Sequence, residues 1–206
     1  TIVLLIFLLV TFGPKSNQAK QVSGPAQNNA QTQQQAQQPS GDQQVPSTTL
    51  TKSDNPTLEA YVVARCPYGI QMQRAMADAV KNIPDLAKYI KSMYIGAVSA
   101  DGKTITAMHG EAEATENLRQ ICIREEQPAK FWPYVACQMK SGDTAGCEKS
   151  TGVDSAKLNT CVSDPSKGVA NAQKDFDLNS QYGIQGSPTL ILNGTQFSES
   201  NYGGRS

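Results

Sequence analysis

The feature that most constrains folding is a polar, glutamine-rich stretch near the start of the chain. Residues 14–56 contain almost no large apolar side chains, and 11 of the 27 residues from Gln18 to Gln44 are Gln. Such a segment cannot bury enough apolar surface to offset the entropy lost on ordering. A Gln-rich tract can also aggregate, but the prolines spread through it favour a plain tether. We therefore expect residues 13–56 to be a disordered linker and residues 57–206 to supply the folded core.

An apolar run, residues 1–12, precedes the linker. It is shorter than the roughly 20 residues needed to cross a bilayer, so it suits the visible end of a signal peptide or membrane anchor. The alternative is a buried strand or helix. No small-residue cleavage pattern follows, which favours an uncleaved anchor and an extracytoplasmic, membrane-anchored protein. The chain starts without Met and ends in a loop-like sequence, so we expect it to be a fragment, truncated at its C-terminus.

The overall charge gives no reason to expect nucleic acid as a partner. Lys plus Arg number 18 and Asp plus Glu number 18, so the formal net charge is zero. Nucleic-acid-binding domains are usually strongly basic or carry a basic patch.

The folded region predicts strands at both ends and helices between them. In chain order we expect a strand at Leu58–Arg65, a helix from Pro67 to Asn82, a strand at Lys91–Ser99, several helices within 111–163, a helix at Lys167–Tyr182, and a hairpin of strands Pro188–Leu192 and Thr195–Phe197 around an Asn-Gly turn. The helices follow from apolar residues at three- and four-residue steps, and the hairpin from its turn. This order predicts an α/β fold with an all-helical insertion.

Cysteine is the residue type that points most clearly to chemistry. Cys122, Cys137, Cys147 and Cys161 fall in the helical block, whereas Cys66 stands alone after the first strand. In an exported protein the four would form two disulfides and leave Cys66 free. The short loop between Cys137 and Cys147 favours that pair, with Cys122 bonded to Cys161, but the other pairings stay open. A zinc site is an alternative, yet with no C-x-x-C and one histidine we expect no metal and no cofactor.

Cys66 is followed by Pro67, Tyr68 and Gly69, where the first strand gives way to a helix. Proline is favoured at the first helical position, which places Cys66 at the helix N-terminus. Free backbone N–H groups and the helix dipole favour a thiolate there, and a thiolate is the species that attacks disulfides. The alternative is a buried structural cysteine. The position and Pro67 together favour a reactive thiol.

A second feature is the Ser187-Pro188 dipeptide, directly before a strand. Proline there is compatible with a cis peptide bond and also with a trans proline at a strand start. Its place after a helix, downstream of the Cys-Pro helix start, favours cis. The only histidine, His109, is expected to be structural.

Taken together, the Cys-Pro-Tyr-Gly sequence at 66–69 and the later Ser187-Pro188 resemble the thioredoxin fold, in which a cis-proline loop faces a cysteine that begins a helix. The segment with His109, Glu113 and Asn117 looks like the signature of the gamma-interferon-inducible lysosomal thiol reductase family. Bacterial DsbA-like exported proteins share the architecture. The resemblance implies a thioredoxin-like fold with a helical insertion.

The chain departs from the family pattern in three cysteines. Ala107 and Ala114 stand where the signature has two further cysteines, and Gly69 stands where the active site usually has its second cysteine. The resemblance therefore implies a one-thiol active site. Cys66 would attack a substrate disulfide, and an external thiol or the substrate's own second cysteine would release it.

From these features we expect an exported thiol–disulfide oxidoreductase or isomerase that acts on protein disulfides. Its nucleophile would be Cys66, and Pro67, Tyr68, Ser187 and Pro188 would contact the substrate. Its partners would be protein substrates with thiols or disulfides, an external thiol or redox partner, and the membrane. The alternative hypothesis is a non-catalytic thioredoxin-fold binding or chaperone module tethered to the membrane.

Overall fold

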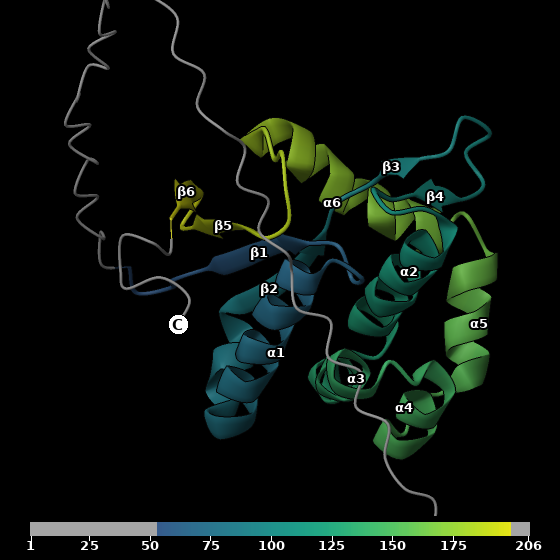
Figure 1. Ribbon diagram of the computed structural model, residues 1–206, viewed down its shortest axis with the longest axis horizontal. Helices are drawn as coiled ribbons and strands as arrows, with labels where there is room; N and C mark the ends of the chain where they lie inside the picture. The colour runs from purple at the N-terminus through teal and green to yellow at the C-terminus, as the bar shows by residue number, and fades with distance from the viewer. Residues whose placement is uncertain (1–52, 199–206) are drawn as a thin grey trace, which may run out of the picture. The chain divides into compact units, whose positions relative to one another are not determined.

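The computed structural model describes residues 53–198 (Figure 1). The predictions for the apolar run, for most of the linker and for the C-terminal end lie outside these residues. The elements are β1 (Leu58–Val62), α1 (Pro67–Asn82), the 3-10 helix η1 (Pro84–Lys88), β2 (Ile90–Tyr94), β3 (Ala97–Val98), β4 (Ile105–Thr106), α2 (Glu111–Glu126), α3 (Pro128–Ser141), α4 (Thr144–Thr151), α5 (Ser155–Ser163), α6 (Gly168–Tyr182), β5 (Thr189–Leu192) and β6 (Thr195–Phe197).

The main sheet has four strands in the order β2-β1-β5-β6. β1 runs parallel to β2, across the connection through α1, and antiparallel to β5. β5 and β6 form the expected hairpin. Asn193 and Gly194 turn the chain there with φ values of 50° and 79°, the positive values that a two-residue hairpin turn of this kind requires.

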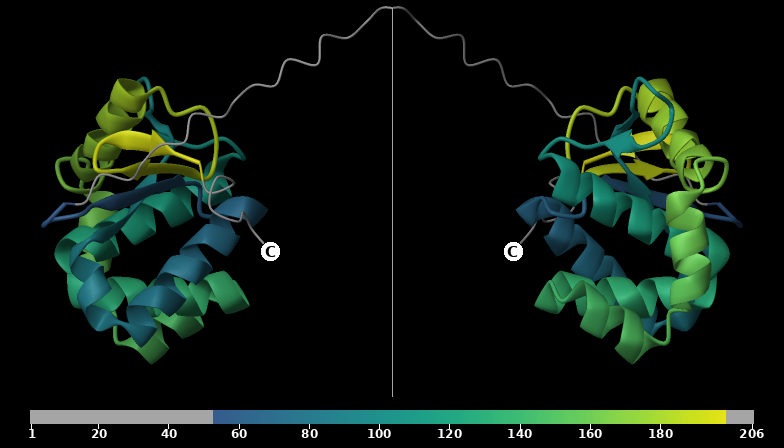
Figure 2. Two further views of the ribbon diagram at one scale, coloured as in Figure 1. Left: turned by 90° about the vertical axis from the view of Figure 1, so that its left-hand side faces the viewer. Right: turned by 90° about the vertical axis from the view of Figure 1, so that its right-hand side faces the viewer.

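Alternation along β1 divides the core between the two faces of the sheet. Ala60 and Val62 belong to a large apolar cluster that includes Met76 of α1. Tyr61, which points the other way, belongs to a smaller cluster completed by Tyr182 at the end of α6. Accordingly, α1 and α6 lie on opposite sides of the sheet (Figure 2).

The expected strand Lys91–Ser99 is wrong in its extent. β2 ends at Tyr94, and β3 pairs instead with β4 in a separate two-stranded sheet. Gly96 lies at the break, where a Cβ atom would come within 2.4 Å of the Thr106 carbonyl oxygen and 2.9 Å of the Phe176 ring. This close approach of backbone and ring is what a glycine within a strand pattern often marks.

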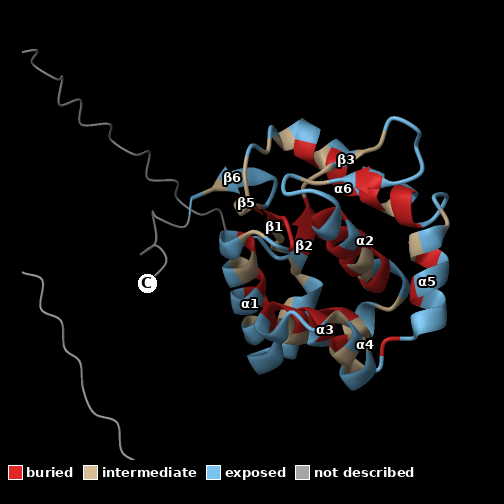
Figure 3. Cartoon of the chain, turned by 45° about the vertical axis from the view of Figure 1, so that its right-hand side comes forward, coloured by how far each residue is buried: buried red, intermediate tan, exposed pale blue. Residues whose placement is uncertain are grey.

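The helical insertion comprises α2 to α5, which together occupy the range 111–163 where the sequence predicts several helices. Gly142 and Gly152 close α3 and α4 in the left-handed conformation, which glycine adopts without strain. Asp143 and Asp154 then cap the following helices by accepting backbone N–H groups. The helices turn buried faces toward one another (Figure 3). The chain therefore has the expected thioredoxin-like fold with a helical insertion.

The outer edge of β2 is closed by side chains from α2 and α6. Arg124 donates to the Ser92 carbonyl oxygen at 2.6 Å. The Tyr94 N–H donates to Asp175 at 2.9 Å, and Asn179 donates to the Tyr94 carbonyl oxygen at 3.0 Å. These bonds satisfy backbone groups that an edge strand otherwise leaves open.

Candidate active site

Cys66 lies where the sequence places it, at the junction of β1 and α1. It is the residue directly before Pro67, the first residue of α1, and its φ and ψ of −71° and 129° are extended. Its N–H donates to the Val63 carbonyl oxygen at 3.2 Å, and its own carbonyl oxygen accepts the Ile70 N–H at 2.8 Å. The residue is half-buried and its sulfur is in no disulfide. The thiol therefore stands at the start of α1 with part of its surface open to solvent.

The second predicted feature, the Ser187-Pro188 loop, faces Cys66. The Ser187–Pro188 peptide bond is cis, as expected. The Cys66 Sγ lies 3.8 Å from the Ser187 carbonyl oxygen, to which the thiol donates. The Ser187 Oγ accepts the Val63 N–H at 3.0 Å. Residues more than 120 positions apart in the chain thus meet around one sulfur atom.

Gly69 occupies a space that has no room for a side chain. A Cβ atom there would lie 2.5 Å from the Val63 carbonyl oxygen and 2.7 Å from the Ser187 Oγ. Both distances are well below an ordinary contact. The Ser187 hydroxyl group therefore fills the place into which a second active-site cysteine would point. The sequence alone showed that the second thiol is missing, but not that its place is filled.

Two other predicted site residues, Pro67 and Tyr68, directly follow Cys66 in the chain. Pro67 is exposed, and Tyr68 is 60% exposed in the first turn of α1. Arg65, directly before Cys66, is exposed, and its charge acts on a buried carboxylate of α2. Burial raises the pKa of Glu116, and the charges of Arg119 and Arg65 oppose that shift.

Asn117 of α2 is a buried side chain at this site to which sequence reasoning gave no role of its own. Its Oδ1 accepts the Ala64 N–H at 2.9 Å, and its Nδ2 donates to the Ile95 carbonyl oxygen at 3.4 Å. Ala64 lies two residues before Cys66. The available signal was the four-residue step from Glu113 to Asn117, which puts both residues on one face of α2.

The hydrogen bonds of His109 join it to Glu113 of α2 and not to residues 63–66. The Glu113 carboxylate accepts the His109 backbone N–H at 3.1 Å and lies 2.8 Å from His109 Nδ1. The Glu113 side chain is fully buried, whereas the His109 ring is half exposed. These bonds hold the start of α2, in agreement with the structural role expected for His109.

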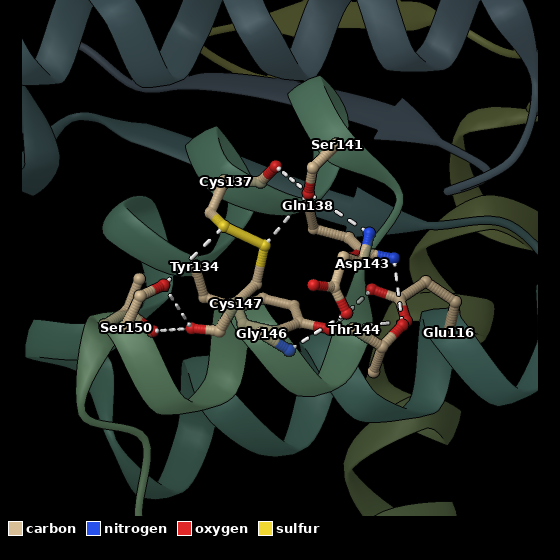
Figure 4. Close-up of a disulfide and its surroundings, with 11 residues drawn as sticks. Glu116, Tyr134, Cys137, Gln138, Ser141, Asp143, Thr144, Gly146, Cys147 and Ser150 are labelled. Atoms are coloured by element: carbon tan, nitrogen blue, oxygen red, sulfur yellow. Dashed lines mark hydrogen bonds between the residues drawn. A yellow bond between two sulfur atoms is a disulfide. The ribbon is translucent and has the colours of Figure 1, made fainter.

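Two disulfides fasten the helical insertion. Cys122 of α2 is bonded to Cys161 of α5, and Cys137 of α3 to Cys147 of α4, the pairing that the spacing favoured. Cys122 and Cys161 are almost completely buried. The Cys137–Cys147 bond lies beside two hydroxyl groups, with the Ser141 Oγ 3.3 Å from the Cys147 sulfur and the Ser150 Oγ 3.8 Å from the Cys137 sulfur (Figure 4). Among residues 53–198 no group of acidic, His or Cys side chains is arranged to hold a metal ion.

A thioredoxin fold, a cysteine at a helix start and a cis-proline loop beside it together define the class of thiol–disulfide oxidoreductases. The model of the gamma interferon inducible lysosomal thiol reductase (GILT) family matches residues 57–164, which is just over half of the chain. The chain therefore belongs to the GILT family.

The chain is also similar to two curated plant proteins. It is 28% identical over 164 residues to vacuolar-sorting receptor 3 of Arabidopsis thaliana, and 28% identical over 163 residues to vacuolar-sorting receptor 4. Each match covers 66% of this chain but only 24% of the receptor. The matched part of the chain thus spans about a quarter of the length of these relatives.

Solved structures with the same fold include bacterial thiol–disulfide proteins. BdbD from Bacillus subtilis is 18% identical with a TM-score of 0.53, and the match covers 72% of this chain and 82% of BdbD. MdbA, a thiol-disulfide oxidoreductase from Actinomyces oris, is 13% identical with a TM-score of 0.51, covering 70% and 74%. The thiol-disulfide exchange protein alpha-DsbA2 from Wolbachia pipientis is 14% identical with a TM-score of 0.50, covering 71% and 75%. At these identities the likeness establishes the fold.

Proposed function

We propose that this protein exchanges disulfides in protein substrates through a single nucleophilic sulfur, that of Cys66. The observation that carries the proposal is the meeting of the Cys66 thiol with the Ser187 carbonyl oxygen beside a cis proline, 3.8 Å apart, at the start of α1. Every other cysteine of the chain is in a disulfide. Cys66 is therefore the thiol available for attack.

In the first step the Cys66 thiolate attacks one sulfur of a substrate disulfide. A bond forms between that sulfur and Cys66, and the other substrate sulfur leaves as a thiolate. Gly69 supplies no second thiol, so the mixed disulfide is opened from outside. If the released substrate thiolate attacks a different disulfide of the same substrate, it frees a new thiolate, and attack of that thiolate on the mixed disulfide expels Cys66 as a thiolate. The net result is isomerisation. If two molecules of an external thiol complete the cycle, they leave as a disulfide and the substrate is reduced.

The loop around Pro188 is the proposed site for the substrate backbone. An extended polypeptide can add to exposed backbone groups as an extra strand, and the backbone of Ser187 lies directly beside the reactive sulfur. Pro67 and Tyr68, the two residues after Cys66, are exposed. We propose that these four residues contact the segment that carries the substrate disulfide.

We propose an extracytoplasmic location, with the N-terminal apolar run as a membrane anchor. Two disulfides in a domain of this size are typical of oxidising compartments, and the family is named for a lysosomal reductase. Within residues 53–198, no helix is both long enough and apolar enough to span a bilayer.

The test is catalysis of disulfide exchange with and without the thiol. The wild-type protein and Cys66→Ser are compared in two assays: reduction of insulin by glutathione, and recovery of a protein refolded from scrambled disulfides. We expect the wild type to accelerate at least one of them and Cys66→Ser to give only the background rate. Equal rates for the two proteins would exclude the proposal.

A binding module is the second candidate, and two observations favour it. The space at Gly69 has no room for a resolving thiol, and the curated relatives are named as sorting receptors. Such a module would bind polypeptides without exchanging disulfides. Retention of an unfolded, cysteine-free polypeptide by the wild type and by Cys66→Ser alike, together with no catalysis by either, would favour the module.

A further inference from the structure

Glu113 and Asn117, two of the residues that resemble the family signature, lie on α2. Neither is a nucleophile, so disulfide exchange by Cys66 does not by itself explain their presence. Of these residues, Asn117 bonds to the reactive-cysteine turn, defined as residues 63–66. Asn117 is completely buried and bridges two points at the ends of parallel neighbouring strands, Ala64 after β1 and Ile95 after β2.

The reactive-cysteine turn depends on side chains from distant parts of the chain for its backbone hydrogen bonds. The Val63 N–H donates to the Ser187 Oγ, 124 positions away, and the Ala64 N–H donates to the Asn117 Oδ1, 53 positions away. Ala64 is only 2% exposed. A buried N–H group without a partner is costly, so loss of the Asn117 acceptor would force the turn to move until another acceptor or water reached Ala64.

The orientation of the Asn117 amide is determined by its two partners. With Oδ1 on the Ala64 N–H, the Nδ2 group meets the Ile95 carbonyl oxygen. The reversed amide would set a donor against a donor at Ala64 and an acceptor against an acceptor at Ile95. Asn117 therefore fits both bonds at once, and neither alanine nor aspartate does.

One turn earlier on α2, Glu113 and His109 hold the beginning of the same helix. Glu113 reaches back to the His109 N–H and ring nitrogen, an arrangement related to a capping box. Between them Gly110 has a φ of 93°, which favours glycine. These contacts hold the first turn of α2, the helix that carries Asn117.

We propose that Asn117 is a positioning residue for the reactive thiol. By holding Ala64, it sets the place of Cys66 relative to the Ser187 carbonyl oxygen. The inference rests on the proposed role of Cys66 as nucleophile. Small displacements of reacting groups lower rates steeply, so removal of the Ala64 bond changes the reactivity of the thiol as well as stability.

The experiment compares Asn117→Ala with the matched variant Asn179→Ala. Asn179 is also buried and also donates from Nδ2 to a carbonyl oxygen at the end of β2, that of Tyr94. It belongs to α6, however, and has no bond to the reactive-cysteine turn. Because the other four cysteines are in disulfides, alkylation of the folded protein reports on Cys66 alone.

Two rates are measured well below the unfolding temperature of each variant: alkylation by iodoacetamide from pH 4 to 9, and reaction with a small aromatic disulfide. Both variants are expected to lose stability. For Asn117→Ala we expect the disulfide reaction to slow about tenfold or more and the pH profile of alkylation to move. For Asn179→Ala we expect both readouts to stay within about twofold of wild type, because this substitution leaves the geometry of the reacting groups unchanged.

Asn117→Asp provides a second test if the alanine variant does not fold. It keeps the shape and the acceptor for Ala64 but loses the donor to Ile95, so we expect a smaller loss of rate than in Asn117→Ala. The inference is overturned if the Asn117 variants that fold match Asn179→Ala in both readouts. A wild-type Cys66 that reacts no faster than a free cysteine would instead overturn the proposed function, which separates the two failures.

Discussion

The close packing at Gly69 makes a prediction that runs against local helix propensity. Gly69 lies in the first turn of α1, where alanine is ordinarily favoured over glycine by about 0.5–1 kcal/mol. On propensity alone, Gly69→Ala would stabilise the protein. The structure predicts the opposite, because the added Cβ would lie 2.5 Å from a backbone oxygen of Val63 and 2.7 Å from the Ser187 Oγ.

The size of the effect follows from setting these two contributions against each other. Insertion of a methyl group into a well-packed site costs about 1–3 kcal/mol, and the Val63 backbone cannot rotate away as a side chain could. After the propensity gain is subtracted, we expect Gly69→Ala to lower the free energy of unfolding by about 1–2 kcal/mol. For a domain of this size that corresponds to a fall in Tm of about 2–8 °C.

Gly186 provides the control, because a Cβ atom there would meet nothing within 4 Å and its φ is not in the left-handed range. We expect Gly186→Ala to be neutral or slightly stabilising, by up to about 1 kcal/mol. Urea denaturation with the disulfides intact measures both variants. A Gly69→Ala protein as stable as Gly186→Ala would refute the claim that Ser187 and Val63 fill the space.

Three further predictions concern the helical insertion and its contacts. Under limiting reductant with mass-spectrometric mapping, Cys137–Cys147 is expected to open before Cys122–Cys161, because Cys137 is half-buried whereas both cysteines of the other pair are almost inaccessible; the reverse order would contradict it. Arg124→Met leaves the Asp175 carboxylate buried without its cation, so unfolding by urea should show a loss of about 3–5 kcal/mol, and adding Asp175→Asn should recover part of it. Burial raises the pKa of Glu116, so this carboxyl group binds a proton more readily in the folded protein than in the unfolded one. Its contribution to stability therefore declines as the pH rises from the ordinary glutamate pKa through the raised pKa. A plot of Tm against pH should accordingly be flatter for Glu116→Gln than for the wild type.

The sequence allowed the helices and the hairpin to be predicted because their signals are local. Pro67 begins α1, glycines end α3 and α4, and the Asn-Gly turn joins β5 to β6. Each of these depends on the φ and ψ that a single residue type adopts easily. The strand expected at Lys91–Ser99 was wrong in its extent: β2 ends at Tyr94, and at Gly96 the backbone passes close to the ring of Phe176, from a helix about 80 positions away. A contact at that separation has no local signal in the sequence.

The reactive cysteine and the proline loop of the candidate site were predictable from the sequence, but the residues that hold them in place were not. Cys66 and Ser187-Pro188 each carry a recognisable local pattern, and their meeting follows from the fold that the pattern resembles. The bond between Asn117 and Ala64 has no such local pattern, because it depends on how α2 sits against the end of β1. The lack of room for a side chain at Gly69 could not be predicted either, because the sequence shows only that glycine replaces a cysteine and not what surrounds it.

The filled space at Gly69 bears on how the proposed enzyme would turn over. If position 69 had merely lost a cysteine, its neighbours would leave room for one; instead Ser187 and Val63 close the gap, so a second thiol requires changes at more than one residue. A mixed disulfide on Cys66 then has no internal route to release. Its rate of release should rise in proportion to the concentration of external thiol, whereas an enzyme with a resolving cysteine releases substrate at a rate independent of that concentration. Single-turnover release from Cys66 of a labelled peptide with a single cysteine, at increasing glutathione, distinguishes the two. A rate that stayed constant would mean that another group of this protein resolves the bond.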